Sequence, residues 1–265
     1  MQGYSFHNLE LEDHDSQTTL CGKEYFFRFL PMLDDNYFRG KTGIDVGCGG
    51  GRHIFWATRL GAEMVGMDLS EAVQLAQKRN KDNPNAHFVQ ADIFNMPFRT
   101  GLFDFAYSIG VLHHLPDPRA GFDALKKLPR KGGDVFVWVY GLKGMKLSYR
   151  LSHMRFLRPF VADLPVGLKV AAAAIITGFL QIFIWTPAAI LAKVPNSQKL
   201  VERIPFSDGF NATIRAKIAR VFDRIQPPVT YFLTKEQLEQ WLSGLKNVDV
   251  VDTTGRGWAA QGGVS

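Results

Sequence analysis

Gly43-Ile-Asp-Val-Gly-Cys-Gly-Gly-Gly-Arg52 decides the fold of this chain, together with Asp68 in the segment Val65-Gly-Met-Asp-Leu-Ser70. The first stretch runs from apolar and small residues through an acid into a glycine-rich turn, and His53–Leu60 then opens a helix. Such a strand–turn–helix unit lets a ligand approach the backbone closely at the glycines. Asp68 ends a second short apolar run, where a doubly wound sheet holds a ribose. The two stretches therefore predict a nucleoside-binding α/β sheet.

The spacing of the glycines indicates which nucleoside cofactor fits. A dinucleotide fingerprint needs the order G-x-G-x-x-G, because a pyrophosphate rests on the helix N-terminus, but Arg52 stands at the third glycine. The pattern is instead D-x-G-x-G-x-G, over Asp45, Gly47, Gly49 and Gly51. An acid at the strand end suits an ammonium group, the helix N-terminus suits a carboxylate, and Asp68 suits a ribose. S-adenosylmethionine carries all three groups.

Three later segments follow the glycine turn in a characteristic order. They are Gln90-Ala-Asp-Ile93, the stretch from Phe103 to Asp117, and Leu128–Trp138. With the glycine turn they resemble the motifs of class I S-adenosylmethionine-dependent methyltransferases, in the methyltransferase type 11 group related to ubiquinone and menaquinone biosynthesis enzymes. The resemblance covers roughly residues 40–140, and Arg130 departs from the usual proline–glycine turn. A single GxG is weak, whereas four motifs in register are a specific signal.

The resemblance implies a cofactor role for each matching residue. The glycine turn would hold the methionine end, and Asp68 would accept hydrogen bonds from both ribose hydroxyls. Leu69 and Ile93 would sandwich the adenine or serve equally as core residues, while Ser108 would lie near the sulfonium or merely end its strand. The predicted cofactor residues are Asp45, Gly47, Cys48, Gly49, Gly51, Asp68, Leu69, Asp92, Ile93 and Ser108, with Asp92 reading the adenine amino group.

Two adjacent histidines, His113 and His114, are the candidate catalytic residues. They follow the fourth predicted strand, and ligands of open α/β sheets bind outside the carboxyl ends of the strands. An imidazole with a pKa near neutrality can take the proton of an attacking hydroxyl, although the pair could also simply order the loop. Tyr231 is the candidate for the acceptor pocket. No histidine or cysteine cluster has metal-ligand spacing, so the sequence predicts no metal.

Strands alternate with helices of about ten residues from Gly43 to Tyr140, which predicts βαβ units. We expect a Rossmann-like, doubly wound, mostly parallel seven-stranded sheet with a helical insert, or lid, between strand five and the last helix. The predicted domains are an N-terminal helical cap (1–40), the cofactor-binding core (41–140), the insert (141–230), and a C-terminal helix and strands (231–265). The predicted core elements are Gly43–Val46, His53–Leu60, Glu63–Met67, Glu71–Asn80, Ala86–Gln90, Phe103–Ser108, Arg119–Leu128, Asp134–Tyr140, Val248–Asp252 and Trp258–Gln261, with Ser70 capping Glu71–Asn80 and a capping box at Thr234–Gln237.

The insert is both basic and apolar. Residues 141–225 hold thirteen Lys and Arg against four Asp and Glu, a charge of +9, whereas the remainder carries −3. Val170–Ala192 has no formal charge and is long enough to span a bilayer, but Pro187 is expected to break it. The composition favours an interfacial or lid helix pair, with peripheral membrane contact through 147–193. Internal packing and an oligomer interface are the alternatives.

These features predict a methyltransferase that acts on a small or amphiphilic acceptor, lipid-like or anionic, by in-line displacement. The acidic start and two distant cysteines, Cys21 and Cys48, indicate a reducing cytoplasmic setting, with peripheral contact at the inner membrane face. One alternative is a nucleic-acid methyltransferase, suggested by the basic excess. Against it, the Asn/Asp-Pro-Pro-aromatic motif of enzymes that methylate base amines is missing after strand four, where Ser108-Ile-Gly-Val stands. The other is a non-catalytic S-adenosylmethionine-binding interaction protein.

Overall fold

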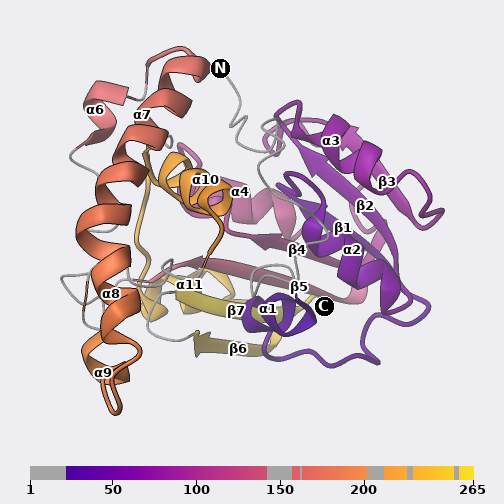
Figure 1. Ribbon diagram of the computed structural model, residues 1–265. Helices are drawn as coiled ribbons and strands as arrows, with labels where there is room; N and C mark the ends of the chain where they lie inside the picture. Colours follow the sequence, from indigo (N-terminus) through magenta and orange to yellow (C-terminus); the bar gives the residue numbers. More distant parts are fainter. Residues whose placement is uncertain are drawn as a thin grey trace. The chain divides into compact units, whose positions relative to one another are not determined.

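The computed structural model describes residues 22–141, 157–161, 163–201, 204, 212–225, 229–253 and 257–265 (Figure 1). The chain forms two compact units. In the first unit the described residues are those up to 141 and from 229 onward, and in the second they lie between 157 and 225. The first 21 residues of the predicted cap, Cys21 among them, and residues 147–156 of the predicted membrane contact lie outside the described residues.

The first unit is built on one seven-stranded sheet in the order β3-β2-β1-β4-β5-β7-β6. Its first five strands pair in parallel, and β7 runs antiparallel to both β5 and β6. This is the predicted doubly wound sheet, completed by two C-terminal strands. The strands are β1 (Thr42–Val46), β2 (Glu63–Asp68), β3 (Ala86–Gln90), β4 (Phe103–Ile109), β5 (Pro129–Tyr140), β6 (Lys246–Asp252) and β7 (Gly257–Gly263).

Alternate residues of the central strands enter two separate cores. In β4, Phe105 and Tyr107 belong to an aromatic core with the first helix, whereas Ala106 between them belongs to an aliphatic core with the later helices. Successive strand residues point to opposite faces, so the sheet is covered on both sides. The helices of this unit are α1 (Lys23–Phe29), α2 (Arg52–Arg59), α3 (Ala72–Arg79), the 3₁₀ turn η2 (Leu112–His114), α4 (Pro118–Leu125) and α11 (Lys235–Trp241).

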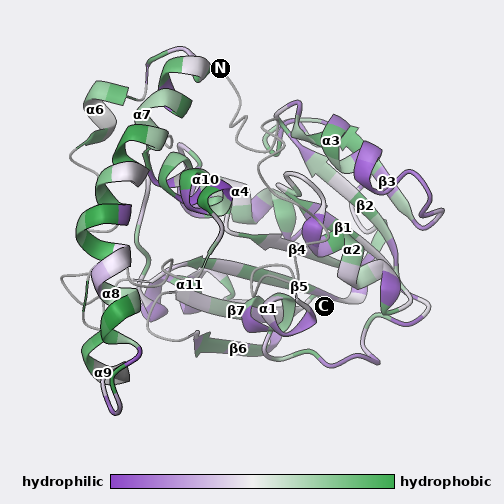
Figure 2. Cartoon of the chain, viewed as in Figure 1, coloured by the Kyte–Doolittle hydropathy of each residue, from purple (hydrophilic) through white to green (hydrophobic). Residues whose placement is uncertain are grey.

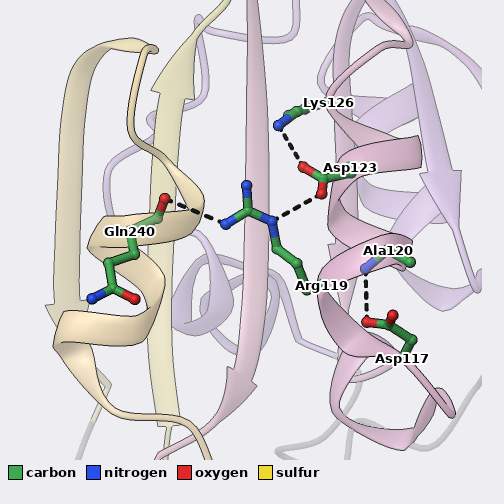
Figure 3. Close-up of polar contacts among 6 residues, drawn as sticks. All are labelled: Asp117, Arg119, Ala120, Asp123, Lys126 and Gln240. Carbon is green, nitrogen blue, oxygen red and sulfur yellow. Dashed lines mark hydrogen bonds and ion pairs between the residues drawn. The ribbon is translucent and has the colours of Figure 1, made fainter.

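Helices α4 and α11 are joined through one arginine (Figure 3). Arg119 donates to Asp123 one turn later over 2.9 Å and to the carbonyl of Gln240 over 3.4 Å. Asp117 caps α4 by accepting from the backbone N–H of Ala120 over 2.9 Å. The predicted capping box of α11, between Thr234 and Gln237, is also present. The Arg119 contact thus joins the last helix to α4.

The second unit contains one long helix. The segment α7 (Val166–Leu180), the π-helical turn η4 (Gln181–Trp185) and α8 (Thr186–Leu191) form 26 continuous residues, long and apolar enough to cross a membrane by length and composition. The predicted break at Pro187 is wrong. Pro187 lies in the first turn of α8, directly after the wider π turn, which relieves the clash of its ring with the preceding backbone. The other helices are α6 (Arg158–Val161), α9 (Gln198–Val201) and α10 (Ile214–Ile225).

Candidate functional site

The glycine turn lies between β1 and α2, at the carboxyl end of the parallel strands. Gly47 and Gly51 have φ values of +85° and +79°, which side chains rarely tolerate. A Cβ on Gly47 would also come within 2.3 Å of Val111 Cγ2. The N–H groups of Gly47 and Cys48 donate to the carbonyl of Met67 over 2.7 and 3.0 Å, which fixes the turn to the end of β2. The turn is therefore held in place by backbone hydrogen bonds and packed too closely at Gly47 for a side chain.

Asp68 at the end of β2 connects this turn to the next loop. Its Oδ2 accepts from the N–H of Gly49 over 2.9 Å, and its Oδ1 accepts from the N–H and the hydroxyl of Ser70 over 2.9 and 2.7 Å. Glu71 occupies the N-cap position without a side-chain bond, and the predicted cap is supplied by Ser70, whose hydroxyl oxygen accepts from the N–H of Ala72, the first residue of α3, over 3.3 Å. The Ser70 hydroxyl therefore both caps the start of α3 and orients Asp68. An Asp-x-Ser turn ahead of a helix was the sequence signal for this contact.

Asp45 in β1 is a buried carboxyl group, with 1% of its surface exposed. Neither of its oxygens has a hydrogen-bond partner among the described residues. Burial, reinforced by the negative charge of Asp68, raises the pKa of Asp45 well above its usual range, although Arg52 opposes the shift. A buried carboxyl group without a partner is costly, and a cationic ligand group beside it would remove that cost. This unpartnered acid beside the glycine turn fits the ammonium group of S-adenosylmethionine.

The predicted adenine residues fall in different environments. Leu69 is 44% exposed at the rim, whereas Ile93 is buried in the aliphatic core. Asp92 is half-buried and accepts from the N–H of Phe94 over 2.9 Å. The side chain of Gln90 donates to the carbonyl of Leu69 over 2.9 Å, which links the loops after β2 and β3. Phe94, which the sequence reasoning missed, is an exposed apolar residue next to this link.

Ser108 is fully buried near the carboxyl end of β4. Its hydroxyl donates to the carbonyl of Val46 over 2.8 Å, so it connects the ends of two neighbouring strands. The Ser108 hydroxyl thus joins β4 to β1 at the carboxyl end of the strands, where the glycine turn begins.

The two histidines lie in contrasting surroundings. His113 is fully buried; its Nδ1 lies 3.4 Å from the backbone N–H of Tyr140, and the two rings are 4.0 Å apart. His114 is half-buried, and its Nδ1 lies 3.1 Å from the hydroxyl of Thr230 and 3.1 Å from the carbonyl of Val229. The structure therefore separates a histidine held inside the fold from one nearer the surface.

Tyr231 lies beside the two histidines because the returning chain passes over the loop after β4. Its N–H donates to the carbonyl of His113 over 2.8 Å, and its hydroxyl donates to the carbonyl of Pro116 over 3.3 Å. The ring remains 42% exposed. Residues more than a hundred positions apart are thus brought together at the carboxyl edge of the first unit.

Comparisons with known proteins relate the first unit to methyltransferases. Residues 44–137 match the family model described as "Methyltransferase domain". The chain is 31% identical over 136 residues to the tRNA U34 carboxymethyltransferase of Idiomarina loihiensis, covering 49% of this chain and 41% of that relative. It is also 31% identical over 138 residues to the ubiquinone biosynthesis O-methyltransferase of Pectobacterium carotovorum subsp. carotovorum, covering 45% and 58%.

The chain spans about half the length of the curated relatives it matches. Among solved structures, the crystal structure of PH0226 protein from Pyrococcus horikoshii OT3 aligns over 94% of both chains, with a TM-score of 0.54 and 15% identity. That likeness concerns the fold alone, and it extends over nearly the whole length of this chain.

Proposed function

We propose that this chain, whose residues 44–137 match a methyltransferase domain, is a class I S-adenosylmethionine-dependent methyltransferase that transfers the methyl group to a small or amphiphilic acceptor by in-line displacement. The acceptor atom forms a bond to the methyl carbon as the bond to the sulfonium sulfur breaks, and S-adenosylhomocysteine leaves. Such a reaction needs chiefly alignment, exclusion of water and removal of the acceptor proton. The observation that carries the proposal is the buried, unpartnered Asp45 beside the glycine turn.

In this proposal the residues around the turn bind the cofactor. Asp45 would hold the ammonium group, the N-terminus of α2 would face the carboxylate, and Asp68 would bind the ribose. Leu69 would cover one side of the adenine ring. Ile93 would support that site from the core, and Asp92 would accept from the adenine amino group. Ser108 would maintain the strand edge through its bond to Val46. S-adenosylmethionine itself supplies the activated methyl group.

We assign proton removal to His114 rather than to His113. His114 is half-buried and lies beside a hydroxyl, so a proton can reach and leave its ring. His113 is enclosed, and its ring stacks on Tyr140. We therefore assign His113 to holding the loop in position. Tyr231, exposed next to both, is the proposed wall of the acceptor site.

The acceptor class rests on the second unit and on the relatives. Residues 141–225 combine a charge of +9 with a long apolar helix, which suits an acceptor with an apolar body and a negative group. The match to a ubiquinone biosynthesis O-methyltransferase supports an amphiphilic acceptor. We propose a cytoplasmic enzyme, peripheral at the inner membrane face, in which residues 141–230 form a helical insert in the methyltransferase core.

Nucleic acid is the second candidate acceptor. It is favoured by the equal identity to a tRNA U34 carboxymethyltransferase and by the same positive charge. The two candidates differ in how turnover responds to salt, since binding to a polyanion weakens steeply as salt rises.

The experiment that tests the proposal measures S-adenosylhomocysteine formation with a polyprenylated phenol, a phosphate-bearing amphiphile and bulk tRNA. We expect turnover with an amphiphile, and His114→Gln should lower kcat by about 10²-fold without changing the Kd for the cofactor. Glutamine keeps a hydrogen-bonding group near Thr230 but cannot take a proton. Turnover with tRNA alone would favour the second candidate. Tight cofactor binding without any turnover would instead favour a non-catalytic binding protein.

A further inference from the structure

The long helix of the second unit, Val166–Leu191, exposes most of its large apolar residues rather than burying them. Most of this helix is coloured as hydrophobic in Figure 2. The residues that it buries are small or polar for the most part, whereas the residues that it exposes are large and apolar. The buried ones are Lys169, Ala173, Thr177, Trp185 and Ala188. The exposed ones, each between 55% and 66% accessible, are Leu168, Ile175, Phe179, Ile182, Phe183 and Ile190. A helix on the surface of a water-soluble domain shows the opposite arrangement.

The exposed residues form a single continuous face. From Leu168 to Ile190 they follow one another at intervals of three, four or seven positions, except that Ile182 and Phe183 are adjacent within the π turn, so they lie along one side of the helix. Between Val166 and Leu191 the only charged residue is Lys169, and that side chain is buried. The face therefore presents no charge over its whole length. We call these six exposed residues, Leu168, Ile175, Phe179, Ile182, Phe183 and Ile190, the apolar face.

The opposite side of the helix is already occupied by α10. Lys217 of α10 donates to Oε1 of Gln181 over 2.8 Å, and its ammonium lies 5.1 Å from the centre of the Trp185 ring. Burial, together with the nearby positive charge of Arg220, lowers the pKa of Lys217. Small residues on a buried helix side permit close approach of a neighbouring helix. Polar contacts thus face inward, and large apolar side chains face away from them.

We propose that the apolar face rests in the acyl boundary of an anionic membrane, with α7–α8 parallel to its surface. Apolar area removed from water supplies the binding free energy. The charge of +9 between residues 141 and 225 matches a surface of anionic lipid, to which each cation near the surface adds attraction. This inference rests on the peripheral location proposed above and names the face that makes the contact; it involves no catalytic residue.

Charge also argues against the other occupants of this face. A second copy of the chain would bring an equal +9 segment against the first, and like charges at an interface disfavour association. A membrane-spanning orientation would carry α10 into the hydrocarbon with Arg215, Lys217, Arg220 and Arg224, which is expensive. A membrane surface accepts both the apolar face and the cations.

The test is flotation of the full chain with phosphatidylcholine vesicles, made with and without phosphatidylglycerol. We expect binding that increases with phosphatidylglycerol and decreases with salt. The double variant Phe179→Gln with Phe183→Gln should lower the partition coefficient by about tenfold or more, because two exposed rings lose their burial in lipid. The matched control is Leu102→Gln, an apolar residue of the first unit with 53% exposure, which should bind as the wild type does.

Retained cofactor binding and an unchanged thermal midpoint will show that the variants are folded. The proposal is overturned if the wild type fails to float with either vesicle, or if the double variant floats equally well. It is also overturned if sedimentation shows a wild-type dimer that the double variant dissolves, since a second copy would then cover the face. Resistance of the bound chain to alkaline carbonate would indicate a spanning helix and would likewise contradict it.

Discussion

Gly49 donates its backbone N–H to Oδ2 of Asp68 over 2.9 Å, so the glycine turn and the end of β2 hold each other in place. Ser70 holds the other carboxylate oxygen through its N–H and its hydroxyl. A carboxylate fixed on both sides loses little freedom when a ligand binds, and such preorganisation increases affinity. Asp68 therefore maintains the turn and is also the proposed ribose ligand.

Replacing Asp68 should accordingly weaken cofactor binding. We expect Asp68→Ala to raise the Kd for S-adenosylmethionine by about tenfold or more, because charge-assisted hydrogen bonds to the ribose are lost. Calorimetric titration with S-adenosylmethionine and S-adenosylhomocysteine measures the change. Glu71→Ala is the matched control, since that neighbouring acid makes no capping bond and should leave the Kd unchanged. Equal affinities of Asp68→Ala and the wild type would refute the role of Asp68.

The buried Asp45 should couple cofactor binding to pH. Burial and the charge of Asp68 raise its pKa, so in the free protein the carboxyl group keeps its proton to unusually high pH. A bound ammonium group would favour the ionised form, so binding should release a proton. The affinity should then rise with pH towards that pKa, by roughly tenfold per pH unit at most.

Titrations in buffers of different ionisation enthalpy will count the protons released. Asp45→Asn should bind the cofactor more weakly and should lose this proton release, because the side-chain amide does not ionise. If the variant and the wild type release the same number of protons, another group is responsible, and the assignment of Asp45 to the ammonium group fails.

Gly47 should tolerate no side chain. Gly47→Ala combines a φ of +85° with a Cβ only 2.3 Å from Val111 Cγ2, so the turn must move. We expect a loss of about 1–3 kcal/mol in the free energy of unfolding and a loss of cofactor binding. Gly40→Ala is the control, because Gly40 lies outside the glycine turn. Its φ of +69° also strains an alanine, but no atom lies within 4 Å of the added Cβ. That variant should lose stability yet bind the cofactor normally, as denaturation and calorimetry will show.

Asp104 should make stability depend on pH. Burial alone would raise its pKa, but hydrogen bonds from the N–H of Thr42 (2.7 Å) and from Nε of Arg130 (2.6 Å) outweigh burial and lower it. The stabilisation is therefore present above about pH 3.9 and is lost as pH falls through the lowered pKa. Asp104→Asn should lower the free energy of unfolding by about 1–2 kcal/mol at neutral pH and by less at pH ~3.

Urea denaturation at both pH values measures this difference. The exposed Asp82 supplies the control, because Asp82→Asn should change stability little at either pH. A constant loss for Asp104→Asn at both pH values would show that shape, rather than charge, makes Asp104 stabilising.

The sequence predicted the sheet well because strand periodicity and glycine spacing are local properties. β3 begins and ends where the pattern places it, at Ala86 and Gln90. β5 begins five residues earlier than predicted, because Pro129 pairs with Phe103 through an irregular register across a stretch that looks like a turn. The effect of Pro187 was predicted wrongly for a related reason, because no local sequence pattern predicts the π turn before it.

The site was predictable only where the chemistry is local. The glycine turn and Asp68 follow from spacing, but His113 and His114 are adjacent and identical in type. What distinguishes them is contact with distant residues: Tyr140 for the first, and Thr230 for the second. Whether Ile93 faces a ligand or the core is likewise set by tertiary packing.

The position of β7 between β5 and β6 has a consequence for synthesis on the ribosome. β5 is complete at Tyr140, but its antiparallel partner begins only at Gly257. At the usual rate of translation, these intervening residues take roughly 6–23 s to emerge. During that interval β5 remains an open sheet edge, which invites pairing with other chains. We therefore expect a nascent chain of this protein to be most prone to aggregation in the interval between the synthesis of β5 and that of β7.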